Sequence, residues 1–210
     1  MLQVENLRFR YGSDNPLLHF PDLSVGAGDS LLLLGESGCG KTTFLNLLAG
    51  LLRPESGSVR IGSTDLSALS DARLDRFRGE HIGLIYQQSY FLDALTAGEN
   101  LLLSPFGRDK QRAASLSHDL GIAPLLRKYP RQLSTGERQR LTIARALMGK
   151  PKVLLADEPT SALDDGNTDR VVELLVDAAR TAKAALLIVT HDNRLRRQFD
   201  NFIELSPQTQ

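Results

Sequence analysis

Apolar side chains recur with two different periods along this chain. Over residues 2–11 they fall close to every second position, with one slip of phase, which predicts a half-buried strand. A weaker pattern over residues 17–25 predicts a second strand, and Pro16 lies in the turn between them. Because both strands precede the first helical pattern, we expect the chain to begin with an antiparallel strand layer.

After about residue 50, short apolar runs of strand length alternate with stretches whose apolar residues are spaced as on one face of a helix. Parallel strands are connected through helices in this way. We therefore predict an α/β protein with a mostly parallel, doubly wound sheet and helices on both faces. The predicted strands are residues 31–34, 57–61 (a short edge strand), 82–86, 153–156 and 184–189, and the predicted helices are 44–52, 63–78, 110–120, one after 137, and 171–182.

Glycine is concentrated between the apolar run 31–34 and the next helix, in the sequence G-E-S-G-C-G-K-T-T of residues 35–43. Positive φ at its glycines would let consecutive backbone N–H groups point into one concavity, and the helix beginning near Lys41 adds its free N–H groups and dipole. This predicts a phosphate-binding loop in which Lys41 neutralises the β- and γ-phosphates and the Thr42 hydroxyl binds Mg²⁺. The residues expected to bind the nucleotide are Gly35, Ser37, Gly38, Cys39, Gly40, Lys41, Thr42 and Thr43, with positive φ expected at Gly35, Gly38 and Gly40.

Polar side chains follow three of the predicted buried strands. Asp157 and Glu158 come directly after one strand, Gln87 follows another, and His191 follows the last. Because ligands bind at the carboxyl ends of such strands, we expect Asp157 to hold Mg²⁺ through a water and Glu158 to act as the general base. His191 would hydrogen-bond the γ-phosphate, and Gln87 would bind Mg²⁺ or order the attacking water.

Composition narrows the range of partners. The chain has 210 residues, 41% of them hydrophobic, and its 25 lysines and arginines balance 25 aspartates and glutamates, so net charge does not favour nucleic acid as a partner. The single cysteine, Cys39, excludes an internal disulfide and a cysteine zinc site, and it is either a redox switch or a small side chain that fills space. Neither a leader pattern nor an apolar run of membrane-spanning length is present, so we expect a cytosolic location.

Together these motifs resemble a known family. The phosphate loop, Gln87, the sequence L-S-T-G-E of residues 133–137, the run ending in Asp157 and Glu158, S-A-L-D of residues 161–164, and His191 follow one another as in the nucleotide-binding subunit of ATP-binding cassette transporters. The resemblance covers residues 2–205. It implies an ATP-hydrolysing core, residues 1–88 and 150–205, with a helical subdomain inserted at about residues 89–149.

The same resemblance implies that two copies of the chain bind ATP between them, head to tail. Ser134 and Gly136 of one copy would bind the γ-phosphate held by Lys41 of the other, and Asp164 would contact the second copy. Tyr11 would stack on the adenine, whereas the residues alone leave it equally well explained as a half-exposed strand tyrosine. His191 becomes the switch histidine.

Glu137, followed by R-Q-R at residues 138–140, resembles the lipoprotein-releasing and macrolide-efflux branch of the family, although Thr135 and Glu137 depart from the commonest glycine and glutamine. This likeness implies a separate integral membrane permease as partner, with the chain peripheral on the inner face of the cell membrane. The apolar residues 90–95 would then receive a cytoplasmic helix of the permease or form the core of the helical subdomain. A non-transport ATPase of the same family, which signals through a membrane protein as in cell division, is the alternative that the residues leave open.

Overall fold

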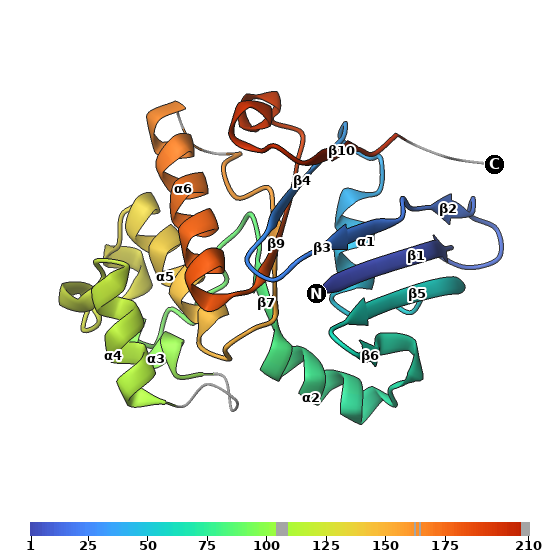
Figure 1. Cartoon of the computed structure of the whole chain (residues 1–210). Coiled ribbons are helices and arrows are strands. Elements are labelled where there is room, and N and C mark those ends of the chain that lie inside the picture. The colour runs from blue at the N-terminus through green and yellow to red at the C-terminus, as the bar shows by residue number, and fades with distance from the viewer. Residues whose placement is uncertain (104–108, 162, 164, 207–210) are drawn as a thin grey trace.

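The computed structural model describes residues 1–103, 109–161, 163 and 165–206. Within these residues the strands form two five-stranded sheets (Figure 1). The first sheet is antiparallel, with β1 at its centre flanked by β2 and β3 on one side and β5 on the other, and β6 outside β5. Its strands are β1 (Leu2–Phe9), β2 (Leu18–His19), β3 (Leu23–Val25), β5 (Ser56–Ile61) and β6 (Thr64–Asp65).

The second sheet is parallel throughout, in the order β10-β4-β9-β8-β7. In this order β9 lies between β4 and β8, so the carboxyl ends of these three strands lie side by side. Ligands bind at this edge of an open parallel sheet. The strands are β4 (Ser30–Leu34), β7 (Ile82–Ile85), β8 (Val153–Asp157), β9 (Ala185–Thr190) and β10 (Phe202–Glu204).

Helices cover both faces of the parallel sheet. In Figure 1, α1 lies between the two sheets, whereas α5 and α6 cover the opposite face. The helices are α1 (Lys41–Leu48), α2 (Asp71–His81), α3 (Ala97–Leu101), α4 (Lys110–Asp119), α5 (Thr135–Leu147) and α6 (Asp165–Ala182), with 3₁₀ turns η1 (Leu66–Ala68), η2 (Ala123–Leu125), η3 (Pro130–Gln132) and η4 (Asn193–Gln198).

Two hydrophobic clusters, one on each face of the parallel sheet, form the core. In β4, Leu31 and Leu33 belong to the cluster shared with α1 and the antiparallel sheet, while Leu32 and Leu34 belong to the cluster under α5 and α6. This alternation is the period of a strand, and burial on both faces explains why the strand reads as a continuous apolar run. The predicted fold class, with its parallel sheet and antiparallel layer, is confirmed.

Several predicted boundaries were wrong. The predicted slip of phase corresponds to an irregularity in the pairing of β1 with β5 between Glu5 and Arg8, where Asn6 has a φ of 50°. The expected strand 17–25, however, is two short strands separated at Pro21, which has no N–H to donate. The predicted edge strand 57–61 is covered at its end, where Arg60 and Ile61 pair with the two-residue β6.

The helix predicted over residues 63–78 begins later in the structure than expected. The segment begins with β6 and η1, where the Asp65 side chain accepts hydrogen bonds from Ser67, and α2 starts only at Asp71. Conversely, α6 begins six residues before Val171, and β10 was not predicted. We find no candidate membrane span among the helices of the described residues, each being too short or too polar to cross a bilayer.

Candidate functional site

The loop between β4 and α1 has the backbone expected of a phosphate cradle. Gly38 and Gly40 have φ values of 83° and 95°, in the left-handed region that favours glycine. Gly40 precedes α1 directly, and no side chain caps the N-terminus of this helix. The first N–H groups of α1 are therefore available to an anion.

Gly35 needs to be glycine for a different reason from the one predicted. Its φ is not in the left-handed region, but a Cβ there would lie 2.6 Å from Sγ of Cys39 and 2.9 Å from the carbonyl oxygen of Leu205. Positive φ was thus correct for two of the three glycines, and close approach explains the third. Cys39 is buried with its sulfur packed against this turn, which favours the space-filling interpretation over a redox switch.

Hydrogen bonds and an ion pair hold the Lys41 side chain beside the phosphate loop. Its Nζ donates hydrogen bonds to the carbonyl oxygens of Gly35 at 2.9 Å and Glu36 at 2.8 Å, and lies 3.7 Å from Oε1 of Glu158. The side chain is 8% exposed. Because its partners are two neutral carbonyls and one carboxylate, this ammonium group can exchange the carbonyls for phosphate oxygens, which are stronger acceptors.

Thr42 and Asp157 form a candidate cation site. Thr42 Oγ1 donates to Oδ2 of Asp157 at 3.1 Å, whereas Oδ1 of Asp157 is buried and has no hydrogen-bond partner among the described residues. Burial raises the pKa of the Asp157 carboxyl, a rise that the Thr42 hydrogen bond opposes and the nearby Glu158 charge increases. A buried carboxylate oxygen left unpaired beside a hydroxyl fits the oxygen ligands that Mg²⁺ prefers.

The carboxylate of Glu158 is surrounded by hydrogen-bond donors. Oε2 accepts from the Thr190 hydroxyl at 2.7 Å, and Oε1 lies 3.2 Å from the His191 backbone nitrogen and 2.7 Å from His191 Nδ1. Glu158 itself is 11% exposed at its side chain, whereas His191 is largely exposed. The structure thus brings Lys41, the first residue of α1, together with Glu158 and His191, which directly follow β8 and β9.

Gln87 belongs to a neighbouring cavity of about 350 Å³. It is exposed there, and the walls also include Glu158 and residues of α5. Gln139 of α5 lines the same cavity, and its buried Nε2 has no partner among the described residues. Gln87 therefore faces the Glu158 side of the site, and its predicted roles toward Mg²⁺ and water stay predictions.

Tyr11 lies just beyond the end of β1, next to the phosphate loop. Its hydroxyl shares a hydrogen bond of 3.1 Å with Oγ1 of Thr43, and its ring packs edge-on against Phe9 with centroids 4.6 Å apart. The residue is 52% exposed. A half-exposed ring thus stands beside the loop, in a position to stack on a base.

The sequence L-S-T-G-E forms the start of α5. The Ser134 side chain accepts from the N–H of Glu137, and the Glu137 carboxylate accepts from the N–H of Ser134 at 2.6 Å, which together make a capping box. These hydrogen bonds lower the pKa of the Glu137 carboxyl. Ser134 and Gly136 are exposed, as residues that meet a second copy must be, and Asp164 lies outside the described residues.

Some side chains of the apolar loop after Gln87 are buried and others are exposed. The two predictions for this loop, a subdomain core and a surface for the permease, therefore do not exclude each other. Phe91 packs against the core cluster under α5, while Tyr90 and Leu92 are 62% and 55% exposed. Asn100, fully buried, holds the loop by donating to the carbonyl oxygens of Leu92, Leu95 and Thr96 and accepting from the Leu92 N–H. The exposed side chains therefore stand on a fixed backbone.

Side chains from α5 attach this loop to the helix, which sequence reasoning did not anticipate. Arg145 donates to the carbonyl oxygen of Tyr90 and lies over the Phe91 ring, 4.8 Å from its centroid. The hydroxyls of Thr142 and Ser89 share a hydrogen bond of 2.9 Å. The helix that begins with Ser134 and the loop that follows Gln87 are consequently one packed unit. Thr190 was also missed, since a threonine at a strand end carries no signal of its own.

Known proteins of similar sequence and structure are numerous. The profile of the ABC transporter family matches residues 18–161. The lipoprotein-releasing system ATP-binding protein LolD of Anaeromyxobacter dehalogenans is 43% identical over 90% of this chain and 82% of its own length, and LolD of Shewanella frigidimarina is 39% identical over 95% and 87%.

Solved structures also match this chain over nearly its whole length. The dimeric ATP-binding cassette MJ0796, in a post-hydrolysis state bound to ADP and Pi, has a TM-score of 0.84 at 29% identity, over 99% of this chain and 95% of that one. The cbiO1 protein from Clostridium perfringens, part of the ABC transporter complex cbiONQ, has a TM-score of 0.88 at 26% identity, over 98% and 84%.

Proposed function

This chain belongs to the ABC transporter family, and we propose that it is the ATP-hydrolysing subunit of a lipoprotein-release or efflux transporter, powering a separate membrane permease. The observation that carries the proposal is the convergence of Lys41, at the start of α1, with Glu158 and His191, which follow the adjacent strands β8 and β9. A phosphate-binding cation, a carboxylate and an imidazole meet there at the mouth of a phosphate loop.

In the proposed reaction, Lys41 leaves the carbonyls of Gly35 and Glu36 and binds the β- and γ-phosphates of ATP. Glu158 accepts a proton from the attacking water, and His191 donates a hydrogen bond to the γ-phosphate. A positioned base contributes about 10²- to 10⁴-fold to such a reaction. Tyr11 stacks on the adenine, a role supported by its half-exposed ring beside Thr43.

Thr42, Asp157 and Gln87 would hold Mg²⁺, a role for which the unpaired Oδ1 of Asp157 is the supporting observation. When bound at such a site, Mg²⁺ neutralises the charge that develops on the transferred phosphoryl group. The contact between Thr42 and Asp157 brings two of these oxygen ligands next to each other.

A second copy of the chain completes the proposed site. Ser134 and Gly136 of that copy bind the γ-phosphate, and Asp164 contributes to the contact between copies. The exposure of Ser134 and Gly136 at the N-terminus of α5, where backbone N–H groups favour an anion, supports this assignment. The dimeric state of MJ0796, a protein of the same fold, is consistent with it.

The permease would dock on the exposed side chains of the loop after Gln87, namely Tyr90 and Leu92. Through this contact the chain is held at the inner face of the membrane. In this proposal, residues 89–149 form the helical subdomain, and residues 1–88 and 150–205 form the nucleotide-binding core. Arg145 and Thr142 connect the docking loop to α5 and so to the residues that meet the second copy.

Co-purification tests this proposal. Tagged chain carrying Glu158→Gln, trapped with ATP and Mg²⁺, should recover a multi-span permease in stoichiometric amount from detergent-solubilised membranes. Exchange of Tyr90 and Leu92 for serine should abolish recovery without affecting ATP binding, whereas Leu51→Ser, at another exposed leucine, should leave it unchanged. Recovery of soluble partners alone would contradict the proposal, and a membrane protein without transport activity would favour the signalling alternative.

A further inference from the structure

Thr190, the last residue of β9, is fully buried and touches Glu158 directly. Its Oγ1 donates to Oε2 of Glu158 at 2.7 Å and accepts from the backbone N–H of Asp192 at 3.0 Å. A hydroxyl has one proton. Because the Asp192 N–H approaches the hydroxyl oxygen as a donor, the Thr190 proton is committed to Glu158.

The backbone around Thr190 connects the same groups. Its carbonyl oxygen accepts from the N–H of Gly35, at the start of the phosphate loop, at 3.1 Å. One residue earlier, Val189 accepts from the N–H of Glu158 at 2.8 Å. Glu158 has a φ of 49°, which is uncommon for a residue other than glycine. Contacts with the end of β9 therefore hold both the backbone and the carboxylate of Glu158.

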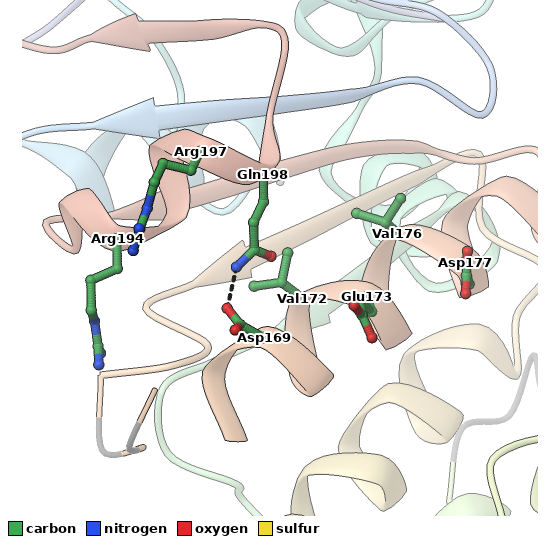
Figure 2. Close-up of a pocket in the computed structure, with 8 residues that line it drawn as sticks. All are labelled: Asp169, Val172, Glu173, Val176, Asp177, Arg194, Arg197 and Gln198. Atoms are coloured by element: carbon green, nitrogen blue, oxygen red, sulfur yellow. Dashed lines mark hydrogen bonds between the residues drawn. The ribbon is translucent and has the colours of Figure 1, made fainter. Parts of the chain in front are cut away.

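The turn that follows Thr190 is anchored on its other side. The Asp192 side chain accepts from the N–H of Arg194 at 3.0 Å, and the Arg194 guanidinium binds the same carboxylate, which lowers the pKa of Asp192. At the end of η4, Gln198 donates to Asp169 of α6 (Figure 2). The Thr190 hydroxyl is thus held between a buried strand and a turn that is tied to α6.

Two of the other groups around Glu158 have a second task in the proposed reaction. Lys41 and His191 both turn to the phosphates of ATP, whereas Thr190 is enclosed and stays on Oε2. We propose that Thr190 is a positioning residue for hydrolysis, which holds Oε2 of Glu158 so that Oε1 is the atom that accepts the proton of the attacking water. This inference rests on the proposed function, in which Glu158 is the base.

The proton, bond and charge changes of this step balance as ATP hydrolysis. The water oxygen forms a bond to the γ-phosphorus, its proton moves to Oε1, and the bond from the γ-phosphorus to the bridging oxygen breaks with its electrons remaining on ADP. Thr190 exchanges no atom in this step. It fixes the direction of the lone pairs on Oε1 by holding the other oxygen of the carboxylate.

A pair of substitutions separates the hydroxyl from the methyl group. Thr190→Val removes the hydroxyl at nearly constant volume, and we expect it to lower kcat about 10-fold or more while KM for ATP stays within about twofold, since the lost hydrogen bond is to a charged group. Thr190→Ser keeps the hydroxyl and should restore most of kcat. Thr168→Val on α6 is the matched control, because Thr168 is also buried but its hydroxyl has no partner among the described residues. If the valine variant folds poorly, Thr190→Cys gives the same comparison, because a thiol is a weak donor.

A second readout needs no nucleotide. In urea unfolding of the nucleotide-free chain, Thr190→Val should cost less in a Glu158→Ala background than in the wild type, because the two side chains interact. Equal kcat in the wild type and the valine variant, equal losses in the valine and serine variants, or additive unfolding free energies would each overturn the proposal. A wild-type chain without ATPase activity would instead overturn the proposed function, while the unfolding cycle would still report whether Thr190 and Glu158 interact.

Discussion

The ammonium group of Lys41 lies 3.7 Å from Oε1 of Glu158, although the two residues belong to different motifs and different strands. The side chains are 8% and 11% exposed, so each partly compensates the burial of the other's charge. The cation assigned to the phosphates and the carboxylate assigned to the water are therefore adjacent. In the proposed reaction, Lys41 binds the phosphates of ATP while Glu158 faces the attacking water.

Removal of the Lys41 charge should weaken nucleotide binding. Lys41→Met eliminates charge-assisted hydrogen bonds to phosphate worth about 1.5–3 kcal/mol each, so the Kd for ATP should rise at least about 10-fold. Isothermal titration calorimetry measures the change. Lys110→Met, at an exposed lysine of α4, should bind ATP as the wild type does. Unchanged ATP affinity in the Lys41 variant would show that the loop does not bind phosphate as proposed.

Adenine stacking predicts a selective effect at Tyr11. Tyr11→Ala should weaken ATP binding by about 1–3 kcal/mol, the usual range for a base stacked on an aromatic ring, and Tyr11→Phe should bind almost normally. The phenylalanine variant also removes the hydrogen bond to Thr43, so it separates stacking from that contact. Equilibrium binding of ATP to both variants, compared with binding of inorganic triphosphate, decides the role, since triphosphate has no base and its affinity should be insensitive to the alanine substitution.

Asp157 should lower the stability of the nucleotide-free chain at neutral pH. A carboxyl whose pKa is raised in the folded state carries a charge that folding disfavours, so its penalty is present at neutral pH and disappears as the pH falls through the folded pKa. Asp157→Asn should therefore raise the free energy of unfolding at pH 7.5 by about 0.5–2 kcal/mol and lose Mg²⁺-dependent hydrolysis. Urea denaturation tests the first effect, and a lower stability of the asparagine variant would argue against it.

The contribution of Glu137 to folding stability should depend on pH in the opposite direction to that of Asp157. Its capping hydrogen bonds to Ser134 lower its folded pKa below the ordinary value of 4.5, so the stabilisation is complete above 4.5 and is lost as the pH falls through the folded pKa. Glu137→Gln keeps an acceptor for the cap but does not titrate. Thermal unfolding between pH 6 and pH 3.5 should show the wild type losing stability relative to this variant below about pH 4.5. Parallel loss of stability in the wild type and the glutamine variant over this range would contradict the prediction.

The periodicity of apolar residues predicted most of the fold. The polar residues that follow the buried strands predicted the candidate site. Buried on both faces, β4, β8 and β9 read as uninterrupted apolar runs, and each is followed by residues that converge in space. Short strands were harder, because β10 is a three-residue strand and the break at Pro21 lies inside a weak pattern. In such segments, pairing with neighbours in the sheet decides the structure more than local pattern does.

The role of Thr190 depends on which strands are neighbours. Until the order β4-β9-β8 is known, nothing indicates that a hydroxyl at the end of β9 reaches a carboxylate at the end of β8. Arg145 and Asn100 are similar, since their partners lie in a loop whose path no periodic pattern predicts. Sequence indicated the candidates for the reactive groups, and the tertiary structure shows which residues contact them.

In the proposed mechanism two copies of this chain close on ATP with Glu158 as the base, and light scattering on the Glu158→Gln variant measures this closure. With ATP and Mg²⁺ this variant should become a stable dimer, because binding is intact and hydrolysis is slowed about 10²- to 10⁴-fold. The same variant without nucleotide, or with Ser134→Arg added, should be monomeric. A Glu158→Gln chain that binds ATP and stays monomeric, or a dimer that forms equally well with Ser134→Arg, would contradict this mechanism.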